Sequence, residues 1–117
     1  MKEFLLLFRS EITPAKELSA EQKKANMKPW QDWLENLASQ DKLSNSGNPL
    51  GNDGKVVKAG NVITNGPFAE LKEAIGGYII IRAKNLDSAA EIAKGCPILD
   101  LGGNVEVRPV VPMDGTN

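Results

Sequence analysis

Two stretches of this chain are apolar at every position, and they limit how it can fold. One is Phe4–Phe8 and the other is Tyr78–Ile81. Side chains alternate between the two faces of a β-strand, so a strand that is apolar throughout needs cover above and below. Both stretches are therefore predicted to be central strands of a sheet, the first ending at Arg9 and the second beginning at Gly77.

A long helix is predicted between these two strands. Ser19 and Gln22 have the spacing of a capping box, and the helical pattern continues to about Ser39. Apolar residues recur on one helix face: Met27, Trp30, Trp33, Leu34 and Leu37. The two tryptophans are accordingly expected in the core and not on a ligand platform. Pro29 removes one backbone hydrogen bond, so a kink or break is expected near Asn26.

A second, shorter helix is predicted after the second apolar strand. Asp87 is the expected N-cap, and Lys94 lies in the last turn, before Gly95 and Pro97 stop the helix. Small and apolar side chains are expected to face the sheet: Ala89, Ala90, Ile92 and Ala93. Small residues at these positions allow a helix to pack closely on a sheet.

Three further segments have the pattern of strands. Lys55–Lys58 and Asn61–Thr64 flank Ala59 and Gly60, as in a β-hairpin. The last strand is predicted over residues 105–110, where apolar and charged residues alternate. The polar segment Asp41–Gly54 is predicted to be a loop with at most a short strand at Lys42–Ser44.

The order of the elements predicts the fold class. It is strand, helix, strands, strand, helix, strand, which is typical of a ferredoxin-like split β-α-β sandwich of the α+β class. One domain is expected over residues 1–117, with a loose tail after Met113. Two helices cover only one face of such a sheet. We therefore expect a second copy to cover the other face in a homodimer, with a pocket between the sheet and the partner.

Composition excludes several classes of function. The net charge is −1 and the basic residues are scattered, so no nucleic-acid surface is expected. No apolar run approaches the ~18 residues of a membrane span, and the N-terminal run is shorter than the ~7–15 residues of a signal peptide core. A cytoplasmic protein is therefore expected. With no histidine and a single cysteine, the chain has no imidazole base, no disulfide of its own and no histidine metal ligand. We expect no cofactor and no metal site.

The segment after the hairpin carries two candidate site residues. Asn65-Gly66-Pro67 is a turn signal, and Lys72 and Glu73 follow it beside the second apolar strand. In the functional interpretation Glu73 is a catalytic base held near the Lys72 cation, where it polarises or deprotonates a small ligand. In the alternative interpretation these side chains form a solvated charge cluster that steadies the loop.

Further candidates border the expected pocket. Arg9 and Arg108 lie at strand ends, where a guanidinium group can clamp a carboxylate bidentately. The alternative is a structural pair with Glu106 or Glu73. Tyr78 is expected in the core with its hydroxyl at the pocket rim. Cys96 follows a helix C-terminus, which disfavours a thiolate, so a buried structural thiol is expected and not a nucleophile.

In these residues the chain resembles the YCII-related family, in its DGPF-type branch. The matching segments are Phe4-Leu5-Leu6-Leu7, Asn65-Gly66-Pro67-Phe68 with Glu70, Lys72 and Glu73, Gly76-Gly77-Tyr78, Leu86-Asp87, Ala89-Ala90, Cys96-Pro97, and Val105-Glu106-Val107-Arg108-Pro109. The resemblance implies a ferredoxin-like fold that dimerises into an α/β barrel. Relatives of that barrel include cofactor-free isomerases, small oxygenases and dehydrochlorinases. Some members of the branch carry a transcription label, which the scattered charge of this chain does not favour.

Two departures from the family pattern affect what the resemblance implies. The Asp that gives the branch its name is Asn65 here, which keeps the turn hydrogen bonds but not acid–base chemistry. The His-Asp pair proposed as catalytic in shorter relatives cannot exist in a chain without histidine.

Three functions follow from the sequence. The first is a dimer that binds a small ligand, including the case of a cofactor-independent enzyme of the isomerase or lyase kind, with Glu73 as base and Arg9 or Arg108 as anion clamp. The second is a non-catalytic sensor or protein-interaction module. The third is a redox role through Cys96.

Overall fold

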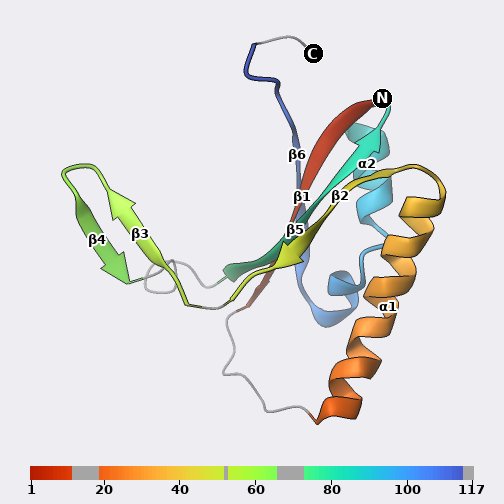
Figure 1. Cartoon of the computed structure of the whole chain (residues 1–117), viewed down its shortest axis with the longest axis horizontal. Coiled ribbons are helices and arrows are strands. Elements are labelled where there is room, and N and C mark those ends of the chain that lie inside the picture. Colours follow the sequence, from red (N-terminus) through yellow and green to blue (C-terminus); the bar gives the residue numbers. More distant parts are fainter. Residues whose placement is uncertain (12–18, 52, 66–72, 115–117) are drawn as a thin grey trace.

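The structure is a computed structural model that describes residues 1–11, 19–51, 53–65 and 73–114. Its main sheet has four strands in the order β2-β5-β1-β6, and neighbouring strands are antiparallel (Figure 1). The strands of the main sheet are β1 (Lys2–Glu11), β2 (Leu43–Pro49), β5 (Glu73–Ala83) and β6 (Asn104–Pro109). The other elements are the helices α1 (Ala20–Ser39) and α2 (Leu86–Ala93), the 3-10 helix η2 (Pro97–Leu101), and the strands β3 (Lys55–Lys58) and β4 (Val62–Asn65).

The predicted α+β class is confirmed. The protein is α+β, with an antiparallel sheet and two helices, consistent with a ferredoxin-like fold. Strands β3 and β4 form a separate two-stranded sheet, inserted in the connection between β2 and β5. The predicted hairpin is thus confirmed, with its second strand displaced by one residue to Val62–Asn65.

The core lies between the main sheet and the helices. On β1, Phe4, Leu6 and Phe8 are buried on the face that the helices cover. The other buried residues are Trp33, Leu37, Ile79, Ile81, Ala83, Ala89, Ala93, Cys96 and Ile98. The Phe8 ring contacts both tryptophans edge to face, with centroids 5.0 Å from Trp30 and 6.1 Å from Trp33. The prediction that the tryptophans belong to the core is confirmed.

The two central strands are longer than predicted. β1 continues through Arg9 to Glu11, and β5 begins at Glu73, so Gly77 does not start it. The register shifts between Phe8 and Arg9, which pair with Gly77 and Ile75, so Gly76 is the extra residue of a β-bulge. A glycine inside a strand often marks such a bulge, and here it was mistaken for the strand boundary.

Strand β2 is the largest difference from the prediction. Only Lys42–Ser44 was expected to be extended, but β2 runs from Leu43 to Pro49 and pairs with the edge of β5. The pairing is irregular and the residues are polar, which an edge strand tolerates because one of its sides faces solvent. The predicted loop was wrong because propensity was outweighed by pairing with an existing edge.

Helix α1 has the predicted extent but not the predicted break. It is continuous from Ala20 to Ser39 across Pro29. A proline removes only one backbone bond, and the packing of Trp33 and Leu37 on the core holds the helix in place. Met27 is 56% exposed, so the expected apolar stripe begins one turn later.

Helix α2 starts at a different cap from the one expected. The side-chain oxygen of Asn85 accepts a hydrogen bond from the backbone N–H of Ser88 at 2.8 Å, so Asn85 is the N-cap and Asp87 lies in the first turn. Ala89 and Ala93 are buried as predicted, whereas Ala90 is exposed. No helix in residues 19–51 or 73–114 is long and apolar enough to span a bilayer.

Candidate functional site

The face of the main sheet away from the helices is called the open face below. At its centre Leu5 of β1 pairs with Ile80 of β5, and Leu7 pairs with Tyr78. These four side chains are only half-buried. The prediction that both central strands are apolar on two faces is confirmed, and only one of those faces is packed against helices.

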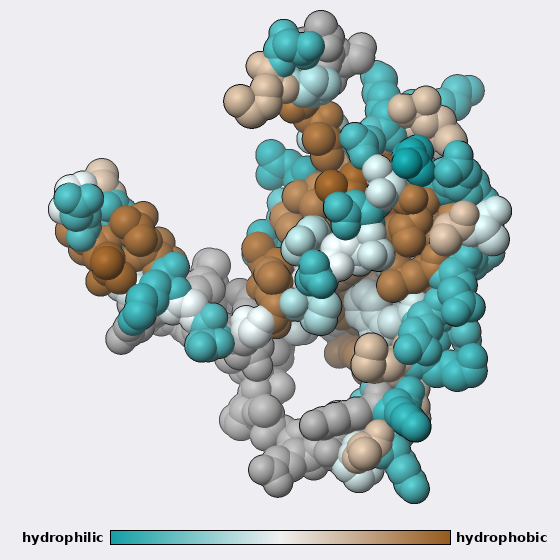
Figure 2. All heavy atoms as spheres, in the orientation of Figure 1, coloured by the Kyte–Doolittle hydropathy of each residue, from teal (hydrophilic) through white to brown (hydrophobic). Residues whose placement is uncertain are grey.

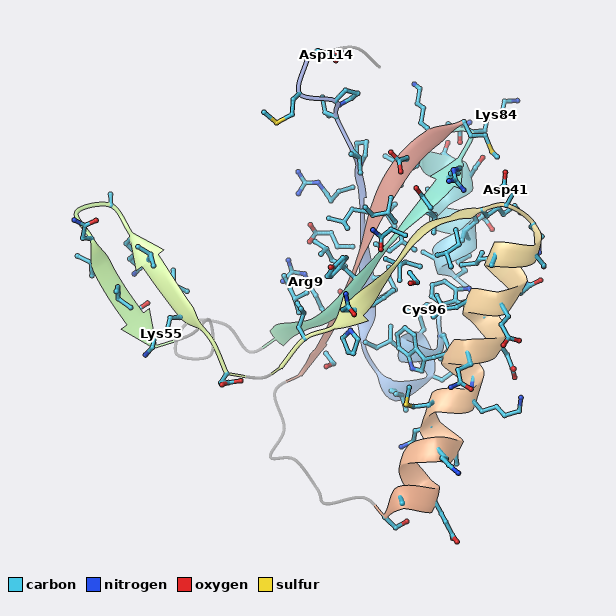
Figure 3. All side chains as sticks on the ribbon, viewed as in Figure 1. Arg9, Asp41, Lys55, Lys84, Cys96 and Asp114 are labelled. Carbon is cyan, nitrogen blue, oxygen red and sulfur yellow. The ribbon has the colours of Figure 1, made fainter. Side chains whose placement is uncertain are left out.

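Two arginines flank one carboxylate on this face. Arg9 Nη2 lies 3.3 Å from Glu106 Oε1, and Arg108 Nη1 lies 3.3 Å from Glu106 Oε2. Register explains the cluster: Glu106 pairs with Leu7, and Arg108 pairs with Leu5, so all three charged residues project from the same side of β1 and β6. In Figure 3 Arg9 lies on the side of the sheet away from α1.

The arginine cluster, defined as Arg9, Glu106 and Arg108, retains a donor and a positive charge. The Arg9 Nε atom is buried without a hydrogen-bond partner among the described residues. Leaving a buried donor unpaired is costly, and for a charged group more so. Two guanidinium groups share one carboxylate, so the cluster carries one net positive charge. It can therefore accept an anionic ligand group at the border of an apolar surface.

A third arginine on the open face is already held by the chain. Arg82 Nη1 lies 3.3 Å from Asp41 Oδ1 and donates to the Leu43 carbonyl oxygen at 3.1 Å. Next to it, Glu3 accepts a hydrogen bond from the Ser44 hydroxyl. These bonds connect β1 and β5 to β2 and to the end of α1, so this end of the open face has a structural role.

The predicted site residues are brought together only in part. Arg9, Arg108 and Tyr78 lie on the open face, with Tyr78 half-buried and not in the core as expected. The backbone of Glu73 pairs with Glu11, two positions beyond the pair of Arg9 with Ile75. Lys72 and the turn at residues 66–68 lie outside the described residues, as does the side chain of Glu73.

Sequence reasoning undervalued Glu106 and missed Asp41. The alternation of residues 105–108 placed Glu106 on the face of Arg108, and a structural pair of either arginine with Glu106 was one of the two alternatives proposed. Asp41 carried no signal, because its contact with Arg82 depends on β2, which was not predicted. No group of His, Cys, Asp and Glu in the described part of the chain is arranged to hold a metal ion.

Cys96 is buried beneath the helices and is far less acidic than a free thiol. Its relative exposure is 2%. Loss of water around the thiolate raises the pKa of Cys96 from 9.0 to about 11, which a hydrogen bond with the Ile98 backbone offsets in part. A protonated, covered thiol is a poor nucleophile, which weighs against a redox role.

We expect Cys96 to react with a thiol probe at pH 8 only as fast as the protein unfolds. Because the pKa of the Cys96 thiol is higher in the folded state, this thiol stays protonated there at pH values at which it has already lost its proton in the unfolded state. The free energy of unfolding therefore falls as pH rises from 9 to 11. Cys96→Ala is expected to lack this fall in the free energy of unfolding between pH 9 and 11. Labelling kinetics with and without urea test the first expectation. Rapid labelling of the native protein would contradict this expectation and would make Cys96 a candidate nucleophile.

Comparison with known proteins supplies one match. The sequence profile of a family described as YCII-related domain matches residues 8–114. The matched segment contains the three residues of the arginine cluster together with Tyr78 and Ile80, whereas Leu5 and Leu7 of the open face precede it. A search of curated proteins returned no match.

Proposed function

This chain belongs to the YCII-related domain family, and we propose that it acts as a homodimer that binds a small acidic ligand at the open face. Residues 65–68 support placing it in the DGPF-type branch of that family. The ligand pocket in this proposal is formed when the open face of one copy is covered by the other. It has an apolar floor at Leu5, Leu7 and Ile80, and the arginine cluster borders it.

The observation that carries the proposal is the net positive charge of the arginine cluster, in which the guanidinium groups of Arg9 and Arg108 share the single carboxylate of Glu106. A ligand carboxylate is the simplest group that neutralises this charge, because it accepts two hydrogen bonds from one guanidinium group. Covering the face with a second copy would lower the local dielectric, which strengthens this interaction. Tyr78 lies across Leu7 from Glu106 and offers a hydroxyl and a ring to the remainder of the ligand.

Thermal melts with small carboxylic acids and phenols test this function. A ligand present at one hundred times its Kd stabilises the folded state by about 2.7 kcal/mol, which raises Tm by several degrees. Arg9→Gln is expected to abolish that shift. Arg82→Gln is the matched control, because it removes an arginine from the same face that Asp41 and Leu43 already hold, and the shift should persist.

Two results would contradict ligand binding at Arg9. One is a panel in which no acid or phenol raises the Tm of the wild type. The other is an equal shift in the wild type and Arg9→Gln.

Catalysis requires a base in addition to the anion site. Glu73 is the candidate in this proposal, as the base of a cofactor-independent isomerase or lyase. A Glu73→Gln variant separates catalysis from sensing: it should bind the ligand found in the melts but leave it unchanged, whereas the wild type converts it. If the wild type also leaves the bound ligand unchanged, the non-catalytic sensor or interaction module is the better description.

A further inference from the structure

The hairpin of β3 and β4 stands apart from the body of the protein. In Figure 1 it extends away from α1, beyond the main sheet. Its main contacts are between its own two strands. An isolated two-stranded hairpin is at best marginally stable in water, since nothing covers either of its faces. The hairpin therefore requires a surface to pack on.

One face of the hairpin is suited to such packing. Val57 of β3 pairs directly with Ile63 of β4, so the two side chains lie next to each other on one face. Val57 is 69% exposed and Ile63 is 61% exposed. Val62, on the opposite face, is 52% exposed. Figure 2 shows apolar side chains on the hairpin, separate from the apolar surface of the body.

The surface of the whole chain is too large for a compact monomer. It exposes 8578 Å², whereas a folded monomer of 12.6 kDa is expected to expose ~6,200 Å². The excess of ~2,400 Å² exceeds the ~800 Å² that each partner contributes to an interface of standard size. The radius of gyration, 16.0 Å against ~13 Å for a compact domain of this length, agrees. The apolar side chains exposed on the hairpin belong to this surface, and a second copy would bury them.

The position of the hairpin identifies where that copy would lie. The open face and the hairpin are both on the side of the sheet away from α1 (Figures 1 and 3). A copy packed on the open face would therefore stand next to the hairpin. Two-fold symmetry would place the hairpin of each copy beside the body of the other.

We infer that the β3–β4 hairpin is an intermolecular arm, whose Val57–Ile63 face packs against the body of a second copy of this chain. The inference rests on the proposed homodimer and adds to it a second contact region. The arm adds a contact between the two copies outside the apolar centre of the open face. It also closes the edge of the proposed pocket from the partner's side.

Sedimentation velocity on a double variant, Val57→Ser with Ile63→Ser, tests the arm. The dimer Kd should rise about tenfold or more, because two apolar side chains leave the interface, while circular dichroism of the body stays unchanged. Leu101→Ser is the matched control: Leu101 is 74% exposed on η2, on the helix side of the sheet, and its loss should leave the Kd within about twofold. A dimeric wild type whose Kd the double variant leaves unchanged would overturn the arm but not the dimer. A monomeric wild type at tens of micromolar would overturn both.

Photocrosslinking gives a second readout, which does not rely on the serine double variant. Ile63 is replaced by p-benzoylphenylalanine and the protein is irradiated at a concentration at which it is dimeric. A covalent dimer is expected, with the crosslink mapped by mass spectrometry to the main sheet of the partner. The same replacement at Leu101 should give only monomer. Crosslinks from position 63 that stay within one chain would contradict the inference.

Discussion

Gly47→Ala is expected to destabilise the protein by about 3 kcal/mol or more, enough to unfold much of a marginally stable population. Gly47 has a φ of 57°, and a Cβ atom there would lie 1.7 Å from the carbonyl oxygen of Tyr78 and 2.6 Å from its carbonyl carbon. These are backbone atoms of the central strand β5, so they cannot rotate away as a side chain would. The Asn45 side chain also accepts a hydrogen bond from the Gly47 N–H at 2.8 Å, which fixes the turn of the chain. The added methyl group must therefore separate β2 from β5.

Gly102→Ala separates this steric effect from the cost of the backbone conformation. Gly102 has a φ of 82°, but a Cβ atom there would have nothing within 4 Å. Its loss is expected to cost about 1 kcal/mol, the usual penalty for a left-handed conformation without a clash. Urea denaturation of the two variants beside the wild type measures the difference. Equal losses at both positions would show that Gly47 does not approach β5 as closely as described.

Gly47 also explains why β2 was not predicted. The features that favour a loop in residues 43–49, a glycine, asparagines and a proline, are the features that let this edge strand bulge around Tyr78. Propensity reflects local preference, whereas the pairing of Leu43 with Ile81 depends on where β5 lies. The same limitation misplaced the start of β5, because Gly76 and Gly77 mark a bulge opposite Phe8 and not a boundary. Segments with strong periodicity, such as α1 and β6, were predicted nearly to the residue.

The candidate site was predictable where alternation along a strand decides it. The pattern of residues 105–108 placed Glu106 and Arg108 on one face, and the apolar first strand placed Arg9 at its end. What the sequence does not contain is the register between strands, which brings Arg9 and Glu106 to 3.3 Å. Register also makes Arg82 structural, since it places that side chain beside the carbonyl of Leu43. Arg9 and Arg82 therefore lie on the same face but have different roles, and only the register between the strands explains the difference.

Adjacent leucines on β1 provide the second large effect, because one faces the helices and the other faces the proposed partner. Leu6 is fully buried, and its neighbours across the sheet are Ile79 and Val107. Leu7 is half-buried on the open face between Tyr78 and Glu106. Leu6→Asp is expected to prevent folding, since an unpaired carboxylate in the core costs several kcal/mol. Leu7→Asp is expected to leave a folded monomer whose dimer Kd has risen by about a thousandfold or more.

Both variants place aspartate, a poor strand former, in the same strand. Any difference between them in folding or assembly therefore comes from which face of the sheet the side chain is on. At position 7 an aspartate would stand directly opposite the Glu106 carboxylate, where the like charges repel. Circular dichroism reports folding and sedimentation velocity reports assembly. A Leu7→Asp protein that dimerises as tightly as the wild type would mean that the open face is not where two copies meet. The ligand site proposed at Arg9 would then lie on the open surface of a single chain, where an anion competes with water for every hydrogen-bond donor.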